Sequence, residues 1–360
     1  MTERIPVKLP IPITLITGFL GAGKTTLLNN ILNADHGLRV AVLVNDFGSV
    51  NIDTQLVVGV EGETISLANG CICCTIRGDL LQAVLNLMAR QEKPQYVIIE
   101  TSGVSDPSAV AATFMQPELT PYVRLDSILT VVDADQGDAL EGEQAFLAME
   151  QVGVADIVIL NKVDLVSPQQ LETMRAWVLD IAPKARIIET TFARVPLELV
   201  LGVGAFDPER LADRQHALDV HVHSAGEASD HDHDHEHDHS LVFETWNWSS
   251  EEPLSFKALR KVIDSLPTTI YRAKGFLYLA DMPESQGILH IVGKRVSLTF
   301  GEKWGVNTPR SQIVVIGQHG GVDASALTAM FTNALVSSQH PSEVDRIRNT
   351  MMEWLRMKKS

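Results

Sequence analysis

The amino-acid sequence predicts an α/β protein with a mainly parallel sheet flanked by helices, followed by a smaller α+β domain. Short apolar runs alternate with helical patterns in the first part of the chain, which is typical of parallel sheets. The composition is globular, with 45% hydrophobic and 21% charged residues. A chain of 360 residues is also long enough for two domains.

The predicted first domain spans residues 1–215. Its apolar runs are short and bounded by polar residues or glycine, so we interpret them as buried strands. The predicted strands are residues 13–17, 40–44, 96–99, 127–132 and 157–160. The predicted helices between them include residues 25–32 and 80–89.

The composition changes after residue 215. Residues 216–240 are rich in His and Asp and have few apolar side chains, so we expect a flexible linker. Residues 241–360 predict the α+β domain with closing helices. Its predicted strands are residues 241–248, 275–279, 288–292, 295–300 and 312–316. Its predicted helices are residues 256–266, which Pro267 ends, and residues 324–335 and 343–357.

Charge and hydropathy exclude several classes of partner. The formal net charge of −16 argues against a nucleic-acid partner, because an acidic chain repels phosphate backbones. No apolar run approaches the roughly 18 residues of a membrane span. The N-terminus, MTERIPVKLP, lacks the apolar core of a secretion signal. We therefore expect a cytoplasmic protein with no membrane partner.

The segment GFLGAGKT at residues 18–25 fits the phosphate-loop pattern of a Gly, four residues and then Gly-Lys-Thr. Glycines let backbone N–H groups point at phosphate oxygens, and the following helix adds the positive end of its dipole. We expect Lys24 to reach the β- and γ-phosphates, Thr25 to bind Mg²⁺ and Thr26 to lie near the α-phosphate. The flanking strand and helix predict a P-loop NTPase fold. The expected phosphate-binding residues are Gly18, Gly21, Ala22, Gly23, Lys24, Thr25 and Thr26.

A second motif, NKVD at residues 161–164, follows the apolar run 157–160. A carboxylate placed like Asp164 accepts from the N1–H and the exocyclic amine of guanine, and adenine lacks this donor pair. We expect Asn161 to tie this loop to the phosphate loop and the Lys162 stem to pack over the base. The motif therefore predicts GTP as the nucleotide, with residues 191–193 as a candidate loop on the far side of the base.

The apolar run YVIIETSG at residues 96–103 ends in an acid and a glycine. A carboxylate here holds the hydration shell of Mg²⁺ or orders the attacking water, so Glu100 joins Lys24 and Thr25 as an expected catalytic residue. Gly103 is free to donate its N–H toward the γ-phosphate. The alternative is a strand-end carboxylate facing solvent. Since no arginine is placed as a finger, we expect slow intrinsic hydrolysis that a partner stimulates.

The three cysteines, Cys71, Cys73 and Cys74, share one short motif. In a protein expected in the cytoplasm, this clustering indicates metal or redox chemistry and not a disulfide framework. Thiolates suit Zn²⁺, Cu⁺ or Co²⁺ far better than Mg²⁺. Tetrahedral Zn²⁺ still lacks a ligand, for which water, a client protein, a second copy of this chain, His36 and Asp46 are candidates. A homodimer is thus among the expected partners. The alternative is buried structural cysteine.

Together these motifs resemble the CobW family of P-loop GTPases, which is similar to the urease and hydrogenase nickel-insertion GTPases. The resemblance is carried by residues 18–26, 69–74, 100–103 and 161–164, and after the linker by YRAKG at residues 271–275. Glu at the position of Glu100 marks the family. The resemblance implies GTP-dependent delivery of a metal to a client metalloprotein, with zinc common and cobalt in some branches.

The chain departs from the family at NDFGS, residues 45–49. The family usually has Asn-Glu-Phe-Gly here and often carries another acid where Ser49 stands. Acidic metal ligands proposed near that segment are therefore not matched in full by this chain.

The linker contains histidines that alternate with Asp or Glu. In an extended chain this pattern places imidazoles on one side and carboxylates on the other. Such a segment offers many exchangeable sites for Zn²⁺, Ni²⁺ or Co²⁺, and we expect it to capture or buffer metal. The alternative is a solvated linker of biased composition. The candidate ligands are His231, His233, His235, His237 and His239.

The sequence thus predicts a GTPase that acts as a zinc metallochaperone. Cobalt delivery, for cobalamin synthesis or a nitrile hydratase, is the nearest alternative. A non-catalytic metal store or sensor, in which the His tract does the work, is an alternative of another class.

Overall fold

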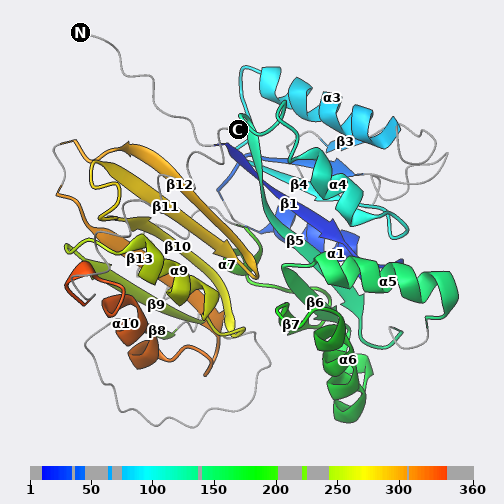
Figure 1. Cartoon of the computed structure of the whole chain (residues 1–360). Coiled ribbons are helices and arrows are strands. Elements are labelled where there is room, and N and C mark those ends of the chain that lie inside the picture. Colours follow the sequence, from blue (N-terminus) through cyan, green and yellow to red (C-terminus); the bar gives the residue numbers. More distant parts are fainter. Residues whose placement is uncertain are drawn as a thin grey trace. The chain divides into compact units, whose positions relative to one another are not determined.

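The computed structural model describes residues 10–34, 37–44, 64–66, 75–136, 140–201, 221–224, 243–305 and 308–338. The chain divides into two compact units (Figure 1). The first comprises Lys8–Gly204 and Gly293–Arg295, and the second is formed mainly by Ala205–Val292 and Val296–Ser360. None of the described helices combines the length and apolar character needed to cross a membrane.

The first unit is built on a seven-stranded sheet in the order β3-β2-β4-β1-β5-β6-β7. Each neighbouring pair in this sheet is parallel, which confirms the predicted α/β class. The strands are β1 (Ile11–Thr17), β2 (Val40–Val44), β3 (Thr64–Ser66), β4 (Tyr96–Glu100), β5 (Val123–Asp133), β6 (Ile157–Asn161) and β7 (Arg186–Thr190).

Helices cover this sheet and close its core. Apolar side chains of α3 and α4 pack on β1, β2 and β4 in one cluster, while α5 and α6 pack on β5 and β6 in another. Local signals start two of these helices: the Asp106 side chain caps α4, and Ser167 and Gln170 form a capping box on α6. The helices are α1 (Lys24–Asn33), α3 (Thr75–Ala89), α4 (Pro107–Thr113), α5 (Gly142–Val154), α6 (Pro168–Ile181) and α7 (Leu197–Val200), with a short 3₁₀ helix η2 (Val163–Leu165).

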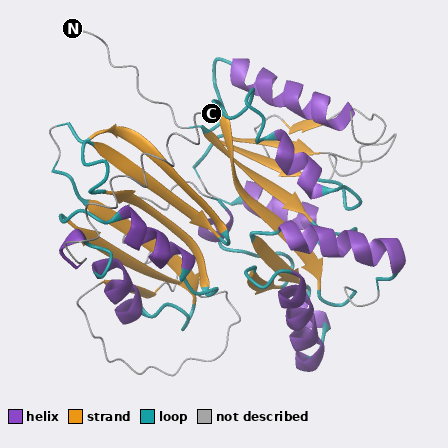
Figure 2. Cartoon of the chain, viewed as in Figure 1, coloured by secondary structure: helices purple, strands orange, loops and turns teal. Residues whose placement is uncertain are grey.

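The second unit contains a six-stranded sheet in the order β12-β11-β10-β13-β9-β8. Helices α9 (Phe256–Asp264) and α10 (Ala324–Thr332) share an apolar core with β9, β10, β11 and β13. In that core, Trp246 stacks on Phe331 with 5.4 Å between ring centroids. Figure 2 shows the strands in orange and the helices in purple. The strands are β8 (His221–Ser224), β9 (Phe243–Ser250), β10 (Ile270–Leu277), β11 (Ser285–Val292), β12 (Arg295–Lys303) and β13 (Ser311–Gln318).

Two predicted elements of this unit differ from the structure. The strand predicted at residues 275–279 is β10, which begins earlier, at Ile270. The prediction missed this start because Arg272 and Lys274 are charged, although both are buried in the structure. Residues 221–224, expected to be part of a flexible linker, form β8 and pair in parallel with β9. The helix predicted at residues 343–357 lies outside the described residues.

The strand pairing places the functional segments on one edge of the first sheet. Ile16 lies opposite Glu100, and Asp133 lies opposite Asn161. Parallel strands end at the same edge, so the loops after β1, β4, β5 and β6 emerge side by side. This edge contains the candidate site.

Candidate functional site

The phosphate loop joins the end of β1 to the start of α1. Gly18, Gly21 and Gly23 have φ values of 133°, 76° and 112°, which residues other than glycine rarely adopt. Space is also restricted: an added Cβ would lie 2.1 Å from the Val131 carbonyl oxygen at Gly18 and 2.4 Å from Asn161 Nδ2 at Gly23. The loop is therefore held against β5 and β6 by backbone that only glycine permits.

Lys24 and Thr25 open helix α1 directly after this loop. The Lys24 side chain is buried, and its ammonium donates to the Phe19 carbonyl at 3.0 Å. The ammonium is thereby folded back over the loop, where the helix N-terminus adds its own partial positive charge. This combination attracts an anion.

Thr25 and Glu100 bring α1 and β4 together. The Thr25 hydroxyl donates to Glu100 Oε1 at 2.8 Å, and Glu100 is only 2% exposed. Both side chains are hard oxygen ligands of the kind that Mg²⁺ prefers. The donor set beside the phosphate loop therefore fits a magnesium ion.

Gly103 lies beside the phosphate loop a few residues after Glu100. An added Cβ would be 2.7 Å from the Leu20 nitrogen and 2.7 Å from its Cδ2, so the two backbones are in close contact. No described residue accepts a hydrogen bond from the Gly103 N–H. This N–H is available to a ligand in the loop.

Asn161 connects three segments. Its Nδ2 donates to the Ala22 carbonyl at 2.8 Å, and its Oδ1 accepts from the Ala193 N–H at 2.8 Å. The first bond is the predicted tie to the phosphate loop. The second places Ala193, in the candidate loop 191–193, next to the NKVD motif. Asp164, in η2, is exposed at the same edge.

Two contributors to this loop cluster were not predicted. Asn30 of α1 donates to the carbonyls of Phe192 and Ala193 at 2.8 and 2.9 Å, which holds both residues at positive φ. Asp133 forms an ion pair with Lys162 at 2.6 Å between Oδ2 and Nζ. The signal for Asp133 was available, because an acid that ends a predicted buried strand resembles the pattern at Glu100.

The predicted thiol and imidazole ligands of the metal lie outside the described residues. They are Cys71, Cys73, Cys74, His231, His233, His235, His237 and His239. Among the residues that are described, no group of three or more His, Cys, Asp or Glu is arranged to hold a metal ion.

Comparisons with known proteins cover both units. Residues 12–189 match the family described as CobW/HypB/UreG, nucleotide-binding domain, and residues 243–335 match the cobalamin synthesis protein cobW C-terminal domain. The chain is 33% identical over 354 residues to a zinc chaperone CobW from Sinorhizobium sp, covering 89% of this chain and 96% of the relative. It is 31% identical to the zinc-regulated GTPase metalloprotein activator 1 of Dictyostelium discoideum, covering 82% and 68%.

A relative and a solved structure come from Escherichia coli. The zinc chaperone YjiA is 31% identical over 317 residues, covering 86% of this chain and 94% of the relative. The crystal structure of Zn(II)-bound YjiA GTPase aligns with 25% identity and a TM-score of 0.43, covering 91% and 99%.

The glycines of the phosphate loop differ in the space available for an added Cβ. This difference predicts that alanine variants at two of them will differ in stability. Gly18→Ala would drive a Cβ into the Val131 carbonyl, whereas at Gly21 nothing lies within 4 Å. We expect Gly18→Ala to lower the free energy of unfolding by about 3 kcal/mol and Gly21→Ala by about 1 kcal/mol. Scanning calorimetry of both variants checks this. Equal losses would contradict the packing of the loop against β5.

Proposed function

Because the chain belongs to the CobW/HypB/UreG family, we propose that it is a GTP-hydrolysing metallochaperone that binds Zn²⁺ through Cys71, Cys73 and Cys74 and passes it to client metalloproteins. The observation that carries the nucleotide part is the hydrogen bond from Thr25 to Glu100 beside the glycine loop. It joins a phosphate-binding segment to a strand-end acid. The family match and the names of the relatives support the metallochaperone part.

The phosphates are bound by Gly18, Gly21, Ala22, Gly23, Lys24, Thr25 and Thr26. Backbone N–H groups of the loop and the N-terminus of α1 face the phosphate oxygens. Lys24 exchanges the Phe19 carbonyl for the β- and γ-phosphate oxygens, which are stronger acceptors because they are charged. Gly103 donates its free N–H to the γ-phosphate.

Thr25 and Glu100 would together hold Mg²⁺. The Thr25 hydroxyl keeps its proton and donates it in the hydrogen bond to Glu100 Oε1, so the lone pairs of the hydroxyl oxygen would remain available to the cation. Mg²⁺, when bound, neutralises charge that develops on the β- and γ-phosphates. Glu100 also orders the water that attacks the γ-phosphorus. With no arginine assigned to the site, we expect slow intrinsic turnover.

Guanine is selected by Asp164, while Asn161 and Lys162 shape its pocket. Asn161 ties the NKVD loop to the phosphate loop. The distance between the guanine site and the phosphate site is then fixed. The Asp133 carboxylate holds the Lys162 ammonium, and the aliphatic stem is then positioned to pack on the base.

The cysteines are connected to the same edge of the sheet. β3 ends at Ser66 and α3 begins at Thr75, so the motif belongs to the connection between them. Ser66 pairs with Val44, which pairs with Glu100. Relatives named zinc chaperones support zinc over cobalt as the cargo. GTP then tightens the cysteine site and hydrolysis loosens it.

The main partner in this proposal is a client metalloprotein. Both proteins act in the cytoplasm. The fourth ligand to Zn²⁺ comes from the client or from a second copy of this chain. The histidine tract supplies metal to the cysteines.

The base-recognition role predicts a change of nucleotide for Asp164→Asn. An amide at this position donates to the 2-oxo group of xanthine and no longer accepts both guanine donors. We expect a loss of GTP affinity of roughly a hundredfold and a gain in affinity for xanthosine triphosphate. Competition binding against a fluorescent nucleotide measures both. Asp180→Asn, an exposed position on α6, is the matched control, and an identical profile in the two variants would contradict the assignment.

Coupling between nucleotide and metal predicts three different zinc affinities. Titration of buffered Zn²⁺ should give a zinc affinity in the GTP state at least about fivefold above that in the GDP state, and zinc should raise the ratio of GTP affinity to GDP affinity by the same factor. Replacing the three cysteines by serine should remove this difference. Equal zinc affinity in the GTP-bound, GDP-bound and nucleotide-free protein would rule the coupling out.

A metal store and a GTP-driven chaperone differ in their response to Lys24→Ala. We expect this variant to keep its total zinc capacity. The change that GTP causes in the rate of zinc release to a fluorescent chelator should fall by about tenfold or more. Lys184→Ala, which removes an exposed lysine of the same unit, is the control. If Lys24→Ala releases zinc like the parent protein, the chain is a store.

A further inference from the structure

Gln151 is a buried amide that the mechanism above does not use. It lies on α5 and is 1% exposed. Its Nε2 donates to the Gly103 carbonyl at 3.0 Å and is 3.5 Å from the Ser105 carbonyl. Since both partners are acceptors, the amide nitrogen must face this segment and the oxygen must face away from it.

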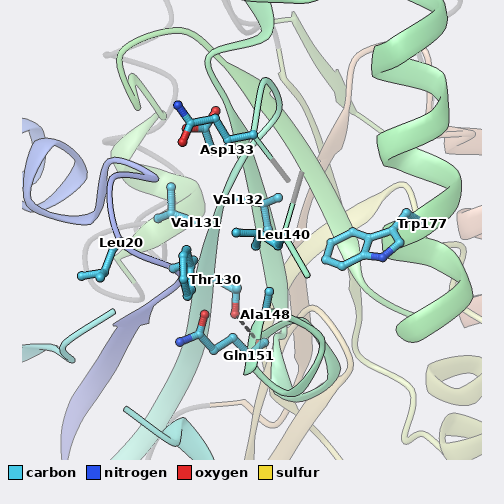
Figure 3. A pocket seen from close by; sticks show the side chains of 11 residues that line it. Leu20, Thr130, Val131, Val132, Asp133, Leu140, Ala148, Gln151 and Trp177 are labelled. Atoms are coloured by element: carbon cyan, nitrogen blue, oxygen red, sulfur yellow. Dashed lines mark hydrogen bonds between the residues drawn. The ribbon is translucent and has the colours of Figure 1, made fainter. Parts of the chain in front are cut away.

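The other side of the amide makes no hydrogen bond with any described residue. Gln151 Oε1 is buried and has no donor there. Gln151 is also one of the residues that line a cavity of about 30 Å³, together with Leu20, Thr130 and Trp177. Figure 3 shows Gln151 below this cavity, with Leu20 and Trp177 on opposite sides. All hydrogen bonds of the side-chain amide therefore go to residues 103–105.

A buried glutamine with an unpartnered oxygen lowers the stability of the fold, so its presence suggests that the contact with Gly103 has a function. An unpartnered buried polar atom costs about 1–3 kcal/mol, and an apolar side chain of similar size would avoid that cost. The N–H and the carbonyl of Gly103 belong to two different peptide planes, and rotation at the glycine between them is freer than at other residues. The N–H therefore keeps one direction only under an external restraint. Leu20 provides one side of that restraint by close packing, and the Gln151 amide provides the other.

We propose that Gln151 is a positioning residue for GTP: by holding the Gly103 carbonyl it limits rotation at Gly103, so that the Gly103 N–H in the preceding peptide stays directed at the γ-phosphate. The residue acts through Gly103 and touches neither the substrate nor the metal. Its contribution belongs to the triphosphate state, because GDP has no γ-phosphate. The inference rests on the proposed GTP hydrolysis.

The test is the ratio of GTP-analogue affinity to GDP affinity in Gln151→Met. Methionine has a similar length but no N–H donor. We expect the affinity for a non-hydrolysable GTP analogue and kcat each to fall roughly tenfold, while GDP affinity changes by less than about twofold. Thr130→Val is the matched control, because the Thr130 hydroxyl donates to the backbone carbonyl of Gln151, at 2.8 Å, and not to its side chain. This variant should leave the ratio unchanged.

A second variant keeps the proposal open to refutation if methionine disturbs the fold. In Gln151→Leu, the side chain is also apolar and lacks an N–H donor but is shorter than methionine, so the same selective loss should appear. If either variant weakens GDP and the GTP analogue equally, or leaves both unchanged, Gln151 only stabilises α5 and the proposal is overturned. If the parent protein binds neither nucleotide, the proposed function itself fails.

Discussion

The site depends on one amide that bonds through both its nitrogen and its oxygen, that of Asn161. Its nitrogen holds the phosphate loop through the Ala22 carbonyl, and its oxygen holds the loop after β7 through the Ala193 N–H. The side chain is 2% exposed, so both bonds are shielded from water. Gly23 has no room for a Cβ because this amide occupies the space. The phosphate-binding and base-binding segments are thus fixed relative to each other before any nucleotide arrives, which reduces the ordering cost of binding.

The convergence of these loops follows from the strand order. β1 lies between β4 and β5. The loops after β4 and β5 therefore leave the carboxyl edge of the sheet on either side of the loop after β1. In open parallel sheets such a point is where ligands bind. The acids that end β4 and β5, Glu100 and Asp133, consequently lie on opposite sides of the phosphate loop. One faces Thr25 and the other faces Lys162, so similar strand-end carboxylates have different partners.

Much of the first unit was predictable, because its signals are local. Buried parallel strands are apolar runs, and the glycine, NKVD and strand-end acid patterns each occupy a few consecutive residues. The features that were missed depend on contacts between distant segments. Gln151 meets Gly103 from a helix of ordinary composition, and β7 has an alternating burial pattern with Arg186 buried inside it. β10 was placed too late in the chain because Arg272 and Lys274 are charged yet buried, which is contrary to the usual preference.

The position of the strands also limits how nucleotide and metal can be coupled. β4 is buried along its whole length and pairs with β1 and β2, so it is unsuited to large movement. A difference between the triphosphate and diphosphate states must then arise in the segments that follow the strand ends. Residues 101–105 are one such segment, restrained by Leu20 and Gln151. The connection that carries the cysteines is another, and Glu100, Val44 and Ser66 stand in one row across the three strands. In the proposed mechanism the γ-phosphate acts on residues 101–105 and the metal acts on the connection that follows Ser66. Coupling between nucleotide and metal then requires only that these two segments adopt two arrangements.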